Sequence, residues 1–199
     1  MHFSEKYKVY WFTPQRTGTR STKQLLSALG FFTQDHHFTF DVNKKDYTFV
    51  SNVRNPYSRM VSLFHLNSHH LKNFNREFKT WVFGTIKNFS FNDKYQLHYH
   101  RNFPLIGRNF DKFIRQEHLQ GDLKKLSFID LNIPEINQAF ENNIIHNGYS
   151  KEFEGEIGEK RKPWKEFYDE ETAMKVFEEM KEQFELFGYR KESWKNVTP

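Results

Sequence analysis

Two short segments of the sequence combine arginine and hydroxyl side chains in a pattern that suits an anionic ligand. In the first, Pro14 to Thr22, a turn with one glycine follows an apolar stretch and precedes a predicted helix. Such a turn lets backbone N–H groups converge on one point, and the positive end of the helix dipole faces the same point. The groups that we expect to bind a phosphate-like ligand there are Arg16, Thr17, the backbone of Gly18, Thr19, Arg20, Ser21 and Thr22. An ordinary strand-to-helix turn with solvated arginines is the alternative.

The second segment, residues 53–62, carries an arginine and a serine eight positions apart. Arg54 is expected at the carboxyl end of a strand, and Ser62 in the second turn of the helix that follows. Asn55-Pro56 between them is typical of a helix N-cap followed by proline at the first helical position. Parallel α/β sheets bind ligands beyond the carboxyl ends of their strands, so both side chains are predicted to reach the ligand of the first segment.

Two familiar nucleotide-binding patterns are missing from the sequence. A Walker A loop reads G-x-x-x-x-G-K-[ST], but the first segment has one glycine and no lysine at the required place. The dinucleotide fingerprint G-x-G-x-x-G is also absent. The pattern therefore disfavours an ATP-dependent kinase of the P-loop type and a dinucleotide enzyme.

The apolar patterns around these segments alternate between strand and helix. Predicted strands are Lys8 to Thr13, Tyr47 to Val53 and Phe110 to Arg115, and predicted helices are Arg20 to Leu29, the segment beyond Pro56, and Leu119 to Ile129. This order predicts one domain over residues 1–199, an α/β fold in three layers with a central, mostly parallel sheet and helices on both faces. Residues 88–109 and 143–165 have weak patterns and are predicted to form loops over a ligand.

The last predicted helix has clear boundaries. Asp169 can cap it, Gly188 can end it, and an apolar stripe runs between them: Ala173, Phe177, Met180, Phe184 and Phe187. Spacings of three and four residues place these side chains on one face, so we expect them in the core.

Composition narrows the function classes. There is no cysteine, which excludes disulfides, Cys-ligated metals and a cysteine nucleophile. A net charge of +5 suits an anionic ligand but is too small to argue for nucleic acid as a partner. No apolar run reaches the 18 or so residues of a membrane span, and the first residues lack a signal-peptide pattern. We therefore expect a cytoplasmic protein without a membrane partner.

The two segments resemble the cofactor signatures of sulfotransferases that use 3′-phosphoadenosine 5′-phosphosulfate (PAPS). The resemblance implies the P-loop-like sulfotransferase fold, 5′-phosphosulfate binding by residues 16–22, and 3′-phosphate binding by Arg54 and Ser62. More weakly, residues 113–119 resemble a later family segment, and the closing helix resembles that of carbohydrate-type members, which favours a glycan acceptor over another small-molecule acceptor. The family often has lysine in place of Arg16, and its late Arg-Lys-Gly motif is not found, although residues 159–163 form a basic cluster.

Sulfuryl transfer needs a base for the acceptor hydroxyl or amine, and histidine titrates near neutral pH. Among ten histidines we favour His37, then His36, because related enzymes place a base between the two motifs. Arg16 is expected to stabilise charge on the leaving phosphate. Three further residues, His98, His100 and Arg101, are expected to face the acceptor, and Glu117 is a less favoured base.

No metal is expected in this chemistry. His65, His69 and His70 lie close together in the sequence, but no third type of ligand accompanies them. Two other functions stay open: a non-enzymatic nucleotide- or RNA-binding module, and a P-loop-like phosphotransferase that needs Mg²⁺.

Overall fold

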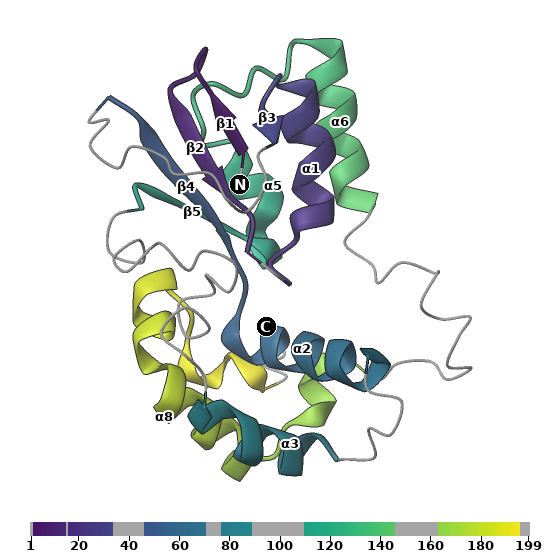
Figure 1. Ribbon diagram of the computed structural model, residues 1–199, viewed down its shortest axis with the longest axis vertical. Coiled ribbons are helices and arrows are strands. Elements are labelled where there is room, and N and C mark those ends of the chain that lie inside the picture. The colour runs from purple at the N-terminus through teal and green to yellow at the C-terminus, as the bar shows by residue number, and fades with distance from the viewer. Residues whose placement is uncertain are drawn as a thin grey trace.

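The computed structural model describes residues 2–14, 16–33, 46–70, 77–88, 110–145 and 163–195 (Figure 1). For residues 20, 21, 68–70 and 142–145 it describes the backbone alone. The described residues form an α/β structure around a five-stranded sheet. No helix in these ranges combines the length and apolar character needed to cross a bilayer.

The sheet is mixed, with strand order β3-β1-β2-β4-β5. Its strands are β1 (His2–Ser4), β2 (Val9–Phe12), β3 (Phe32–Thr33), β4 (Thr48–Val53) and β5 (Lys112–Arg115). β2, β4 and β5 are parallel, as predicted, but β1 pairs antiparallel with both β2 and β3. The prediction of a mostly parallel sheet is therefore wrong for half of the described pairings. The physical reason is the short turn of residues 5–8, which permits a hairpin but not a parallel crossover.

The described α-helices are α1 (Thr19–Ala28), α2 (Pro56–His70), α3 (Phe78–Thr85), α5 (Leu119–Leu123), α6 (Pro134–Ile145) and α8 (Glu170–Phe187). Short 3-10 helices are η1 (Ile86–Asn88), η3 (Gln116–His118), η5 (Trp164–Phe167) and η6 (Lys191–Trp194). α1 starts one residue before its predicted start. α5 is shorter than predicted, because the N–H groups of Lys125 and Leu126 bond three residues back instead of four.

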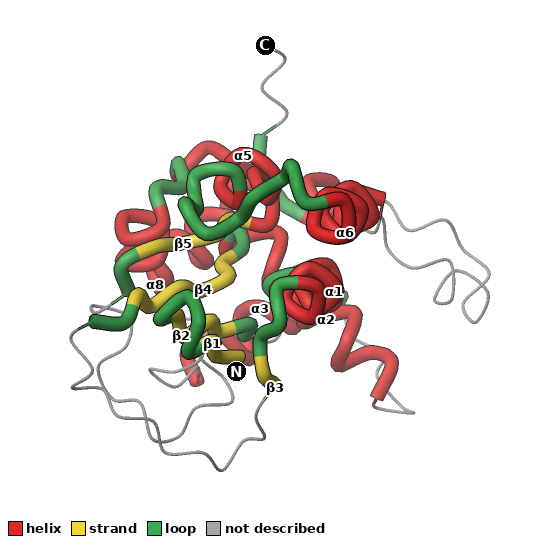
Figure 2. The backbone as a smooth tube through the Cα atoms, turned by 90° about the horizontal axis from the view of Figure 1, so that it is seen from above, coloured by secondary structure: helices red, strands yellow, loops and turns green. Residues whose placement is uncertain are grey.

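One face of the sheet is covered by α1, α5 and α6. Alternate residues of β2 and β4, including Trp11 and Val50, pack with apolar residues of these helices, such as Leu25 and Phe140. Viewed from above, α1 and α6 lie side by side on the same side of the strands (Figure 2). The alternation of strand side chains thus builds this half of the core.

The second group of helices does not form the third layer that was predicted on the other face of the sheet. α2, α3 and α8 form a core of their own, and they lie beyond the carboxyl end of β4 (Figure 1). The opposite face of the sheet carries an aromatic cluster that includes Tyr10, Phe12 and Tyr47. α8 reaches that face at Phe187, whose ring centroid lies 5.0 Å from that of Phe113.

The predicted boundaries of α8 are confirmed. The Asp169 carboxylate accepts a bond from the Thr172 N–H at 2.7 Å, and Gly188 ends the helix with a φ of 73°. The predicted stripe is buried at four of its positions and partly buried at Phe177. These local signals therefore sufficed to place the helix.

Candidate functional site

The two predicted ligand-binding turns leave the same edge of the sheet. β2 and β4 are parallel neighbours, with Phe12 opposite Ser51, so the turns that follow them start side by side. Nε of Arg16 donates to Oγ of Ser62 at 2.8 Å, and Nη1 of Arg54 lies 3.4 Å from the carbonyl oxygen of Arg16. The structure thus brings together Arg16, Arg54 and Ser62, which come from distant parts of the sequence.

The first turn has the backbone of an anion-binding loop. Arg16 and Gly18 both have left-handed φ values, of 67° and 91°. Gly18 is the N-cap of α1, and no side chain caps this helix end or places an acid in its first turn. The first N–H groups of a helix have no partner within it, so the N–H groups of residues 19–21 mark the positive end of the dipole.

Gly18 also lies in close contact with a side chain that follows β5. A Cβ built on it would lie 1.5 Å from Oε1 of Gln116, which follows β5 directly. Since real side chains do not approach so closely, any larger residue at position 18 must displace Gln116. The glycine therefore serves both the left-handed backbone and the contact with a third strand end.

The three threonines of the first turn donate their hydroxyl protons within the turn. Thr17 donates to the Pro14 carbonyl at 2.7 Å, and Thr19 donates to the carbonyls of Thr13 and Pro14, both at 3.1 Å. Thr22 donates to the carbonyls of residues 18 and 19 and accepts a bond from Nδ2 of Asn52 at 3.1 Å. Their direct contact with a ligand stays a prediction, while their role in shaping the turn is visible.

Asn52 links that turn to the sheet. It is fully buried, and its Oδ1 accepts a bond from Nε1 of Trp11 at 2.8 Å while its amide nitrogen donates to Thr22. Both ends of this amide are satisfied, so β2, β4 and the start of α1 are held in one arrangement. A buried asparagine in an apolar strand was a signal for this link that sequence reasoning passed over.

The second turn has the predicted cap. Oδ1 of Asn55 accepts a bond from the Tyr57 N–H at 3.0 Å, and Pro56 is the first residue of α2. Within the turn, Nε of Arg54 donates to Oγ of Ser58 at 2.8 Å. This bond aims the guanidinium along the start of α2, toward the first turn.

A third strand end adds a carboxylate that sequence reasoning considered only as a less favoured base. Oε1 of Glu117 accepts bonds from the Asn55 N–H at 3.0 Å and from the Ser58 hydroxyl at 3.1 Å. Its other oxygen accepts a bond from the Tyr189 hydroxyl at 2.7 Å. It lies two residues after the end of β5, as Arg54 lies one residue after the end of the neighbouring parallel strand β4, and this nearness to a strand end was the available signal.

The strand before Glu117 is anchored by an ion pair. Both side-chain oxygens of Asp122 accept bonds from the Arg115 guanidinium at 2.9 Å. Burial by itself would raise the pKa of Asp122, but the bonds from Arg115 outweigh it and lower that pKa to about 2. The pair therefore fixes the end of β5 against α5 throughout the neutral range.

One histidine lies beside the first turn, although the sequence did not single it out. The ring nitrogens of His2 lie 3.0 Å from Oγ1 of Thr33 and 3.4 Å from Oγ1 of Thr13. Burial, with smaller contributions from nearby positive charges that include Lys23, lowers the pKa of His2 to about 4, so the ring is neutral near pH 7. Because it is buried, it serves to hold β1 against the turn.

Several predicted site residues lie outside the described residues. These are His36, His37, His98, His100 and Arg101, and with them residues 159–162 of the basic cluster. The side chains of Arg20 and Ser21 are not described either. Their roles as base, acceptor contacts and cofactor contacts stay predictions.

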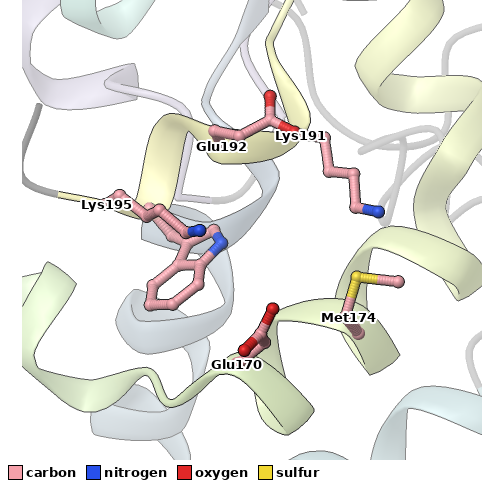
Figure 3. Close-up of a pocket in the computed structure, with 6 residues that line it drawn as sticks. Glu170, Met174, Lys191, Glu192 and Lys195 are labelled. Atoms are coloured by element: carbon pink, nitrogen blue, oxygen red, sulfur yellow. The ribbon is translucent and has the colours of Figure 1, made fainter.

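The described residues contain no group of three His, Asp or Glu that could hold a metal ion. They do line a hollow of about 120 Å³ between α8 and η6 (Figure 3). Its lining residues are Glu170, Met174, Lys191, Glu192, Trp194 and Lys195. None of these belongs to the two turns, so the hollow is not the predicted cofactor site.

Comparison of the chain with models of protein families, with curated proteins and with solved structures gives no match.

Proposed function

We propose that this protein is a PAPS-dependent sulfotransferase that transfers a sulfuryl group to a hydroxyl acceptor, with a carbohydrate as the favoured class. The observation that carries the proposal is the convergence of the two turns, through Arg16 with Ser62 and Arg54 with the Arg16 backbone. A ligand with phosphates at both ends of one nucleoside suits two adjacent cationic turns. A ligand with one phosphate would need one turn only.

In this proposal each turn binds a different phosphate of the donor. The N–H groups at the start of α1 would bind the 5′-phosphosulfate, since the helix dipole and the left-handed turn face it. Arg54 and Ser62 would bind the 3′-phosphate. Because the Arg16 guanidinium donates to Ser62, it lies between the two proposed phosphate sites. From there it can also stabilise charge on the leaving phosphate.

The donor would supply the sulfuryl group, and the protein would supply positioning and electrostatic stabilisation. The acceptor oxygen attacks sulfur in line, its proton passes to a base, and the bond from sulfur to the phosphate oxygen breaks. The electron pair of that bond stays on the phosphate, facing Arg16 and the N–H groups of the first turn. His37, and after it His36, is our proposed base.

Titration calorimetry with 3′-phosphoadenosine 5′-phosphate tests the cofactor assignment. We expect binding without added metal, and we expect Arg54→Ala to weaken it by about 2 kcal/mol or more, since a charged phosphate contact is lost. Lys181→Ala removes a positive charge from an exposed position of α8 and serves as the matched control. Absence of binding by the unaltered protein, or equal losses in the two variants, would overturn the assignment.

A second experiment tests the reaction. Incubation with a radiolabelled sulfate donor and a panel of glycans and small alcohols should label at least one acceptor, and His37→Ala should stop transfer while nucleotide affinity persists. Full transfer by His37→Ala would exclude that residue as the base. Mg²⁺-dependent turnover of ATP instead would select the phosphotransferase alternative.

A further inference from the structure

The end of β5 contacts both predicted phosphate-binding turns. Oε1 of Gln116 lies against Gly18, as the 1.5 Å distance to a built Cβ shows. The next residue, Glu117, accepts bonds from Asn55 and Ser58 at the start of α2. Two consecutive side chains thus contact one turn each, so the end of β5 sets how the two turns stand relative to each other.

A continuous chain of hydrogen bonds runs from the end of α8 to Arg54. The Tyr189 hydroxyl donates to Glu117, the Ser58 hydroxyl shares its proton between the other oxygen of Glu117 at 3.1 Å and the Asn55 carbonyl at 3.2 Å, and Nε of Arg54 donates to Ser58. The Ser58 hydroxyl can donate and accept at once, so it transmits the orientation of the carboxylate to the guanidinium. Ser58 is buried, which limits competition from water at that step, whereas Glu117 is exposed.

Both sides of the Glu117 carboxylate are held. Two donors at the start of α2 fix one oxygen, and Tyr189 fixes the other. Gly188, with its φ of 73°, turns the chain after α8 and brings Tyr189 to this place. Burial and the neighbouring carboxylate raise the pKa of Tyr189, so its hydroxyl keeps the proton that it donates.

We propose that Glu117 is a positioning residue that orients Arg54, through Ser58, for the 3′-phosphate of a nucleotide. This inference rests on the proposed function. An ionised carboxylate only accepts hydrogen bonds, and it repels phosphate, so Glu117 does not itself bind the ligand. Its effect passes through Arg54.

Charge and positioning predict opposite effects of neutralising Glu117. A negative charge near a phosphate site weakens anion binding, so by charge alone Glu117→Gln would tighten it. If Glu117 orients Arg54, the same substitution weakens binding of the 3′-phosphate, because Ser58 loses a charged acceptor. The sign of the change in affinity therefore distinguishes a positioning role of Glu117 from an effect of its charge alone.

The test compares two probes, 3′-phosphoadenosine 5′-phosphate and adenosine 5′-monophosphate, which differ in the 3′-phosphate. We expect Glu117→Gln to weaken the first by about tenfold and to leave the second nearly unchanged. Glu141→Gln, at an exposed position of α6, is the control for loss of a negative charge and should leave both affinities unchanged. A purely structural loss would weaken both probes alike.

A double-mutant cycle of Glu117→Gln with Ser58→Ala tests whether Glu117 acts on Arg54 through Ser58. If Glu117 acts through Ser58, the double variant should lose no more affinity for the bisphosphate than the larger single loss, whereas independent effects would multiply. Should Glu117→Gln fail to fold, Tyr189→Phe removes one hydroxyl from the same carboxylate and should weaken the bisphosphate selectively, by less.

The outcomes separate the inference from the proposed function. If the unaltered protein does not prefer the probe with the 3′-phosphate, the proposed function fails. If that preference exists and Glu117→Gln and Tyr189→Phe keep it, or if Glu117→Gln increases it, the inference alone is overturned.

Discussion

The two turns of the candidate site are stabilised in different ways. The hydroxyl groups of the first turn bond to carbonyls a few residues away, as Thr17 does to Pro14 and Thr19 to Thr13. The second turn is held by residues far along the chain: Asn55 bonds to Ser193, Tyr57 to the Lys191 carbonyl, and both Asn55 and Ser58 to Glu117. The hydroxyl groups of the first turn therefore bond locally, with distant links added through Arg16 and Asn52, whereas the second turn is held mainly by residues far along the chain.

This difference explains the effects that we expect from substitutions. Damage to the first turn should act through backbone conformation and close contacts. Substitutions in the second turn should act through the loss of long-range hydrogen bonds, and each should cost less unfolding free energy.

The largest expected effect is that of Gly18→Ala. The new Cβ meets both a left-handed φ of 91° and the amide of Gln116, whereas Gly30→Ala meets a φ of 72° and no atom within 4 Å. We expect Gly30→Ala to cost about 1–2 kcal/mol of unfolding free energy and Gly18→Ala about 1 kcal/mol more, because the Gln116 side chain must rotate away from its position. Chemical denaturation measures both.

The double variant Gly18→Ala/Gln116→Ala isolates the contact. It should recover most of the difference between the two glycine substitutions, since the blocking amide is gone. If Gly18→Ala costs no more than Gly30→Ala, the contact between Gln116 and Gly18 contributes nothing to stability.

Acid should lower the stability of the protein through His2, which holds β1 against the first turn. The folded-state pKa of His2 lies near 4, below its ordinary 6.5, so its contribution to stability is complete above about pH 6.5 and falls as the pH drops toward 4. At pH 5 the loss is about 2 kcal/mol. Denaturation at pH 7 and pH 5 should show this loss, and His2→Gln should remove it. An equal pH dependence in the variant would contradict the assignment to His2.

The smallest expected effects concern the second turn. Asn55→Ala removes the cap of α2 and should cost about 1 kcal/mol, while Ser193→Ala keeps the cap, removes one long-range bond and should cost less. Thermal unfolding measures both. Equal losses would mean that the cap contributes nothing beyond the link to Ser193.

The sequence predicted the local features of both turns well. Glycine at the start of α1, Asn55-Pro56 at the start of α2, and Asp169 with Gly188 around α8 are short-range signals, and each has the predicted role. Such signals depend on backbone preferences within a few residues, which a sequence displays directly.

Long-range partners were not predictable in the same way. The bond from Asn55 to Glu117 joins residues 62 positions apart, and the bond from Asn55 to Ser193 joins residues 138 positions apart. Periodicity shows which side chains are buried but not which of them meet. β1 was missed because three residues carry too little pattern, and α3 because its aromatic residues do not favour helix strongly.

The central claim is that the two turns jointly bind one nucleotide with a phosphate at each end. Determination of the structure with 3′-phosphoadenosine 5′-phosphate bound tests it most directly. The account predicts the 5′-phosphate at the backbone N–H groups beside Gly18 and the 3′-phosphate at Arg54 and Ser62. A nucleotide bound elsewhere, or with both phosphates at a single turn, would contradict it.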